Sequence, residues 1–124
     1  MREIKFKFWD IESRIMWSWE EAQDEWEEIG YSYAKFRQDH YIALQYTGLK
    51  DKNGVEIYEG DIIKQSKFSG FFPIPYEYEI YNITFENGSF ICSNAHCFDR
   101  KIMNQHCKVI GNIYENKELL EAAK

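Results

Sequence analysis

Five side chains of metal-ligating type lie within a stretch of sixteen residues: Cys92, His96, Cys97, His106 and Cys107. Zinc binds Cys and His in tetrahedral sets, so the residue types suit a metal centre. The spacing is Cys-x3-His-Cys followed by His-Cys, which matches none of the common zinc patterns. Because free Cys packs like a small hydrophobe, we expect reduced thiols without metal, and a zinc-stapled domain or zinc enzyme is the weakest alternative.

A catalytic pair is not favoured by the sequence either. His96 and Cys97 are adjacent, and neighbours in a strand point to opposite faces, which makes them poor partners for proton transfer. The chain has no Gly-x-Ser-x-Gly, no His-Glu-x-x-His and no phosphate-cradling glycine loop. We therefore expect no enzyme, no catalytic residue and no cofactor.

An aromatic stretch from Phe68 to Tyr81 is the strongest candidate for a binding surface, and Lys64 and Lys67 precede it. Such rings stack on bases, anchor protein interfaces or simply pack in a core. Gly70 stands before two Phe residues, and two Pro residues follow, which predicts an extended, projecting loop or sheet edge for residues 66–75. Rings on such a segment are hard to bury, so we predict a binding surface that contains Phe71, Phe72 and Tyr76.

Charge decides between the partners of this surface. The formal net charge is −6, with nine acidic and four basic residues in 1–30, and twelve acidic and eleven basic in 31–124. An acidic chain opposes broad binding to nucleic acid, which needs Lys and Arg against phosphates. A protein partner, either a second copy or another protein, is therefore favoured, and a nucleic-acid-binding small barrel is the alternative.

Composition and length indicate one mainly β domain. The chain has 124 residues, including nine Tyr, nine Phe and four Trp, and large rings favour pleated sheets. No apolar run approaches the roughly 20 residues of a membrane span, and no signal peptide is visible. Three Cys residues, an odd number, suit a reducing cytoplasm better than a disulfide framework.

The N-terminal part, residues 1–39, reads as a hairpin and a short acidic helix. Alternating apolar residues predict strands over 3–9 and 14–18. Apolar residues from Trp19 to Ile29 then follow a helical spacing, with Ser18 and Glu21 as a capping box and Gly30 as a stop. The acidic residues of this helix form either an ordinary wet face or a docking surface for a basic partner.

The remainder, residues 40–124, reads as a series of short strands joined by tight turns. Strands are predicted over 41–49, 55–57, 62–63, 76–85, 90–92 and 108–114, and a helix capped by Asn116 over 117–122. The residues predicted to form turns are Asn53, Gly54, Gly60, Asp61 and Gly88. We predict that Gly60 adopts a backbone conformation that strains a branched side chain.

The turn-rich centre of the chain carries a resemblance. Residues 45–62, which include Tyr-Thr-Gly-Leu-Lys-Asp-Lys-Asn-Gly, resemble the central motif of the YopX-like proteins of bacteriophages and prophages. Residues 1–10 are similar to the opening of that family, and residues 109–116 to its close, although Lys117 stands where the family pattern has Pro. The resemblance implies a small SH3-like barrel in the C-terminal portion, and it implies no established activity and no catalytic residue.

These observations predict a single mainly β domain over 1–124. Residues 1–39 form a hairpin with a short acidic helix, and residues 40–124 form a small SH3-like barrel with a short C-terminal helix. The predicted function is a phage- or prophage-encoded, non-enzymatic interaction module in the cytoplasm of the bacterial host. It binds protein, as a homo-oligomer or with a host protein, and no membrane.

Overall fold

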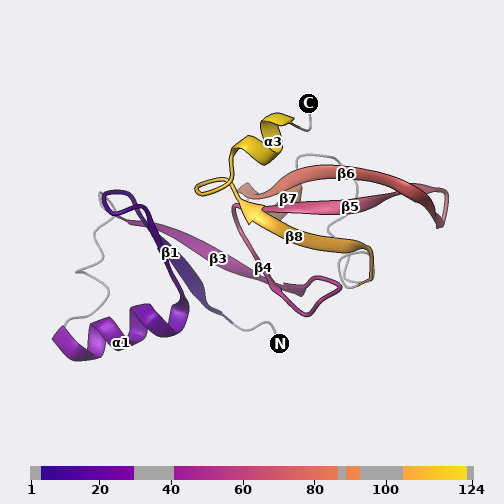
Figure 1. Cartoon of the computed structure of the whole chain (residues 1–124). Coiled ribbons are helices and arrows are strands. Elements are labelled where there is room, and N and C mark those ends of the chain that lie inside the picture. The colour runs from indigo at the N-terminus through magenta and orange to yellow at the C-terminus, as the bar shows by residue number, and fades with distance from the viewer. Residues whose placement is uncertain (1–3, 30–40, 87–88, 93–104, 123–124) are drawn as a thin grey trace. The chain divides into compact units, whose positions relative to one another are not determined.

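The computed structural model of the chain describes residues 4–29, 41–86, 89–92 and 105–122. They fall into two compact units, residues 1–46 and residues 47–124 (Figure 1). The boundary falls within the long strand β3 (Tyr41–Lys50).

The first unit consists of antiparallel strands and one helix. Strand β1 (Phe6–Asp10) pairs with β2 (Ile15–Trp17) on one side and with the beginning of β3 on the other. Helix α1 (Trp19–Ile29) follows β2 directly. Phe8 and Ala22 are buried in the core of this unit. The partly buried residues that pack against them are Phe6, Trp17, Trp19, Tyr41 and Ala43. The predicted hairpin and acidic helix are confirmed.

The predicted capping box holds the start of α1. The backbone N–H of Glu21 donates to Ser18 Oγ at 3.1 Å, and the backbone N–H of Ser18 donates to Glu21 Oε1 at 3.0 Å. These bonds satisfy amides that have no partner inside the helix. Hydrogen bonding to Ser18 lowers the pKa of the Glu21 carboxyl below its ordinary value. The bond with the Ser18 backbone has the larger effect, and the bond with the Ser18 side chain has the smaller one.

The second unit contains most of the strands. The end of β3 pairs with β4 (Glu56–Tyr58). A second sheet has the order β7-β6-β5-β8, in which β5 (Asp61–Ser69) lies between β6 (Phe72–Glu86) and β8 (Cys107–Asn112). Strand β7 (Ser89–Cys92) pairs with the end of β6, and α3 (Glu118–Ala122) closes the described chain. The chain is mainly β with curled antiparallel sheets, which confirms the predicted fold class.

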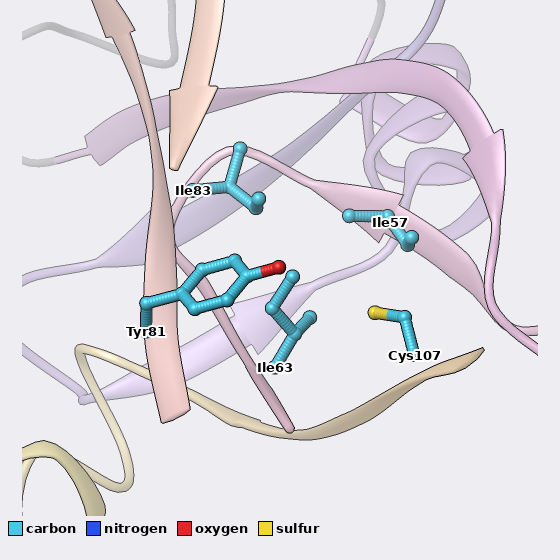
Figure 2. Close-up of a cluster of buried hydrophobic side chains, with 5 residues drawn as sticks. All are labelled: Ile57, Ile63, Tyr81, Ile83 and Cys107. Atoms are coloured by element: carbon cyan, nitrogen blue, oxygen red, sulfur yellow. The ribbon is translucent and has the colours of Figure 1, made fainter. Parts of the chain in front are cut away.

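The core of this unit is shared by strands from both sheets. Ile57 of β4, Ile63 of β5, Tyr81 and Ile83 of β6, and Cys107 of β8 are buried together (Figure 2). Leu49, Phe90 and Val109 pack around them. Burying one such isoleucine contributes about 1.5–3 kcal/mol, so these contacts hold β4 and the end of β3 against the larger sheet.

The segment 66–75 is not a loop, which corrects one of the two predicted alternatives. Strand β5 continues to Ser69, and β6 begins at Phe72, which pairs with Ser69. Only Gly70 and Phe71 connect the strands, and Gly70 has a φ of 65°. A glycine with positive φ in the first place of a two-residue connection matches the twist of a hairpin, so Ser-Gly-Phe-Phe is a turn signal.

Gly60 occupies the predicted special conformation, with a φ of 88°. Its N–H donates to the carbonyl of Ile83 at 2.7 Å, and its own carbonyl accepts from the N–H of Ile113 at 2.9 Å. The residue therefore ties the turn before β5 to β6 and to the chain after β8. Gly54 also has a positive φ, of 80°. Glu86 and Ser89 pair as predicted, whereas Gly88 lies outside the described residues.

We expect Gly60→Val to lower the free energy of unfolding by about 1–3 kcal/mol, because a branched side chain is strained at this positive φ. Urea unfolding followed by circular dichroism measures the change. Gly60→Ala should lose part of the same stability, since the strain begins with the added Cβ. A Gly60→Val variant with the stability of the parent would contradict this assignment of the turn.

We expect acid to loosen the first turn of α1. The folded-state pKa of Glu21 is lowered, so its capping contribution is complete above the unfolded pKa and is lost as pH falls through the folded pKa. The protection factor of the Ser18 amide, measured by NMR exchange from neutral to acidic pH and corrected for the intrinsic exchange rate at each pH, should fall over that interval. Glu21→Gln should remove this acid dependence, and the exposed neighbour change Glu20→Gln should retain it. Acid dependence that survives Glu21→Gln would contradict the prediction.

Candidate protein-interaction surface

The acidic residue of the central turn, Asp51, serves the fold. Its side chain is buried, and Oδ1 accepts from the N–H groups of Asn53 and Val55 at 2.8 and 2.9 Å. Its Oδ2 accepts from the N–H of Val109 in β8 at 2.8 Å. The N–H of Lys52 adds a bond to the carbonyl of Cys107 at 3.0 Å. The carboxylate thus closes the turn and fastens it to a strand far along the chain.

Two further polar residues of the central motif have similar structural roles. The Thr47 hydroxyl donates to the carbonyl of Ile57 at 2.7 Å, which holds β3 against β4. Asp61 Oδ2 accepts from the N–H of Tyr58 at 2.7 Å, across the turn that contains Gly60. Buried polar groups must be hydrogen-bonded to be tolerated, and these side chains meet that need with backbone partners.

The closing motif is a compact turn. Asn112 Oδ1 accepts from the N–H groups of Tyr114 and Glu115 at 3.0 and 2.9 Å. Asn116 Oδ1 accepts from the N–H of Asn112 at 3.1 Å, so the Asn116 side chain turns back toward β8, and its backbone carbonyl bonds Leu119 in α3. A Cβ at Gly111 would lie 2.5 Å from Asn116 Oδ1, which explains a glycine there.

One titratable group in this region is perturbed. Burial raises the pKa of the Tyr114 hydroxyl, and the negative charge of Glu59 raises it further. Both effects favour the neutral phenol, so Tyr114 adds no charge near the turn.

The predicted metal-type residues are only partly described. Cys107 is a free, buried thiol in the core, and the His106 ring lies edge-on to Phe68 with 5.0 Å between centroids. Cys92 belongs to β7, whereas His96 and Cys97 lie outside the described residues. Within the described ranges, no three His, Cys, Asp or Glu residues could hold a metal ion. The expectation of reduced, metal-free thiols stays a prediction.

The hairpin of β5 and β6 continues beyond its neighbouring strands. Strand β8 pairs with β5 as far as Gln65, and β7 pairs with β6 only from Ile83 onward. Residues 66–78 are therefore a two-stranded extension in the described structure, here named the distal ribbon (Figure 1). Two isolated strands are marginally stable in water, so the ribbon depends on the sheet at its base and on any partner it meets.

A large bulge interrupts the distal ribbon. Between the pairs Phe68–Pro73 and Ser66–Tyr78, β5 has one residue, Lys67, whereas β6 has the four residues from Ile74 to Glu77. Proline lacks an N–H donor and is found in strands mainly at edges and bulges. Within the bulge Tyr76 has a φ of 63°, an uncommon value for a large side chain. The bulge therefore directs Tyr76 out of the strand pairing.

The turn and the bulge leave three rings in water. Phe71 is 95 % exposed, Phe72 77 % and Tyr76 91 %. Tyr78, at the base of the ribbon, is also exposed and has Lys64 Nζ 4.4 Å from its ring centroid. The structure thus brings all three predicted binding residues to the end of one ribbon. The two features that expose these rings were not predicted from the sequence. The Gly70–Phe71 turn could have been predicted from it, whereas the bulge could not.

The fold and the surface define a small, mainly β protein with an exposed aromatic ribbon and a turn motif used for architecture. The family model described as YopX protein matches residues 5–121, so the chain belongs to the YopX family. The crystal structure of protein EF1440 from Enterococcus faecalis is similar to this chain. Its TM-score is 0.70 at 24 % identity, over 97 % of this chain and 99 % of that one.

The similarity to EF1440 extends to the fold and not to a function. The comparison with functionally curated proteins found no match. In the described part of the chain, no helix has the length and apolar character needed to cross a membrane.

We expect Asp51→Asn to lower the free energy of unfolding by about 1.5–3 kcal/mol, because the amide turns one acceptor into a donor that faces a backbone N–H. Thermal and urea unfolding measure the loss. The same chemical change at exposed Asp24 in α1 is the matched control and should change stability by at most about 0.5 kcal/mol. Equal stability of the two variants would contradict the role of Asp51.

Proposed function

We propose that this protein is a non-enzymatic interaction module that binds protein through the distal ribbon. The observation that carries the proposal is the exposure of Phe71, Phe72 and Tyr76 at the end of a ribbon that projects beyond its sheet. An apolar patch of this kind is unusual on a soluble protein unless it is used. The protein partner covers the three rings.

The area of the rings is sufficient for such a role. Each large aromatic side chain buries about 150–250 Å², so three supply roughly 450–750 Å². A specific protein interface of standard size buries about 800 Å² on each partner. The rings alone therefore provide most of one side of an interface. Aromatic residues are also the side chains that most often carry binding energy in interfaces.

The charges around the rings favour protein over nucleic acid. Residues 70–76 contain no charged side chain, and the net charge of the chain is −6. In the hairpin around them, Lys64 and Lys67 are balanced by Glu77 and Glu79. Phosphates are bound by an excess of Lys and Arg, which this surface does not provide.

A nucleic-acid-binding barrel is the second candidate. The observation that favours it is Lys64, whose Nζ lies 4.4 Å from the ring centroid of Tyr78, close to exposed aromatic residues. Single-stranded nucleic acid binds to surfaces that combine rings for stacking with cations along the backbone. The two lysines near the rings are balanced by two glutamates, so the surface has no excess of positive charge. Nucleic-acid binding therefore ranks below protein binding.

The absence of catalysis is part of the proposal. Thr47, Asp51 and Asp61 are buried polar residues of the described chain, and each uses its side chain to hold backbone groups. A general acid or base instead needs a side chain that reaches a substrate proton. The YopX family supports a phage- or prophage-encoded protein, and an odd number of cysteines with a buried free thiol is consistent with the host cytoplasm.

We expect a photo-crosslinking phenylalanine analogue in place of Phe71 to form protein adducts in host lysate. The further changes Phe72→Ala and Tyr76→Ala should reduce the yield, because they remove the neighbouring anchors. The same analogue at Val55, an exposed apolar residue outside the ribbon, is the matched control and should not form those adducts. Adducts are identified by mass spectrometry, with this chain itself counted among the captured proteins.

Binding of the parent protein to nucleic acid is the result that would contradict the proposed protein binding. The parent protein should not shift single-stranded or duplex DNA in a gel at low salt, where charge interactions are strongest. Micromolar DNA binding that is lost in the variant with Phe71→Ala and Phe72→Ala, together with no protein adduct, would replace the proposal with the second candidate.

A further inference from the structure

We infer that the partner of the distal ribbon is the distal ribbon of a second copy, with the two packed face to face about a two-fold axis that runs along the ribbons. This inference rests on the proposed function and names its partner. In a two-fold interface, residue i of one copy contacts residue j of the other, and j contacts i. A surface that joins its own copy must therefore be complementary to itself in charge and in shape.

The charges of the ribbon meet this requirement. Lys67 on β5 and Glu77 on β6 are exposed, and they lie on the two strands at the same level of the ribbon, at the end away from the Gly70–Phe71 turn. When the two ribbons stack face to face and point the same way, β5 of each copy lies over β6 of the other, so Lys67 of each copy comes beside Glu77 of the other and one contact is made twice. An antiparallel arrangement would lay β5 over β5 and β6 over β6, so it would not bring the opposite charges together. The ribbon thus selects both its partner and the orientation of that partner.

The distribution of charge along the chain permits the approach. Residues 1–30 contain nine acidic and four basic side chains, whereas residues 47–124 contain eleven acidic and nine basic ones. The unit that bears the ribbon is therefore almost neutral. Repulsion between the acidic N-terminal segments of two copies is screened over about 10 Å at 0.1 M salt. Two ribbons can meet without a large electrostatic barrier.

The area also favours a second copy. With rings on both sides, two copies bury roughly 900–1,500 Å² of aromatic surface. A stable interface requires about 1,200–2,000 Å² in total, so the rings and their flanking residues reach this range without help from another protein. A foreign partner would have to supply a matching apolar surface for its whole half. The second copy already carries one, and the dimer protects a two-stranded ribbon that is marginal alone.

The first test is the mass of the full-length protein in solution. Light scattering and sedimentation velocity over a range of concentrations should show the mass doubling from monomer to dimer. Phe71→Ala with Phe72→Ala should weaken dimerisation on the order of tenfold or more, as expected for aromatic anchors. Val55→Ala, which truncates an exposed apolar residue outside the ribbon, should leave the dimer intact. Far-UV circular dichroism confirms that each variant is folded.

Charge reversal tests the pairing directly. Lys67→Glu alone should be monomeric because each new carboxylate faces Glu77 of the other copy, and Glu77→Lys alone should be monomeric for the corresponding reason. An equal mixture of these two variants should form a heterodimer, since both contacts then join opposite charges. The variant that carries both changes should dimerise like the parent. Charges that paired only within one chain would not be rescued by mixing.

A parent protein that stays monomeric, or a dimer that survives both the alanine pair and the single charge reversals, would overturn the inference. The crosslinking result then separates it from the proposed function. If the chain is monomeric but the analogue at position 71 captures a host protein, the second copy is the wrong partner and protein binding stands. If the chain is monomeric and no protein is captured, both proposals fail.

Discussion

The bond between Asp51 Oδ2 and the N–H of Val109 joins residues that are 58 positions apart. It connects the first tight turn of the second unit with its last strand. A charged acceptor forms stronger hydrogen bonds than a neutral one, and burial protects these bonds from water. The strands β4, β5 and β8 are short and pack around one small core. The link supports their arrangement because, together with the bond from the Lys52 N–H to the Cys107 carbonyl, it holds the turn against β8.

The use of the motif for architecture places function elsewhere on the molecule. The turn residues that carry the family resemblance hold strands together through backbone bonds, as Gly60 does with Ile83 and Ile113. Such residues constrain the fold without offering groups to a substrate. The distal ribbon has the opposite character, because its rings are exposed and Tyr76 lies in an uncommon backbone region. Strain and exposure of this kind are tolerated where they serve recognition. The architectural residues and the proposed binding surface thus lie in different parts of one small protein.

The local signals in the sequence were strong enough to predict most elements. Apolar alternation from Ile4 to Phe8 and the helical spacing after Ser18 identify the hairpin and α1, because side-chain direction follows backbone period. The glycine turns at residues 54 and 60 were readable for a similar reason, since positive φ values are costly for other residue types. Of the two alternatives predicted for residues 66–75, a loop or a sheet edge, the loop was wrong, because the prolines suggested a break whereas a bulge accommodates them within β6.

The sequence by itself determined the mainly β class, the family, the turn residues and the exposed aromatic segment, since each depends on local backbone preference or residue order. Tertiary structure alone decided the partners of Asp51, the junction at Gly60 and the close fit of Gly111 against Asn116. These contacts join residues that chain folding brings together, and no local pattern encodes their pairing. The register of β5 and β6, which places four residues of β6 opposite Lys67, is likewise not encoded by a local sequence pattern. It results from the match between two whole strands, and it is what exposes Tyr76.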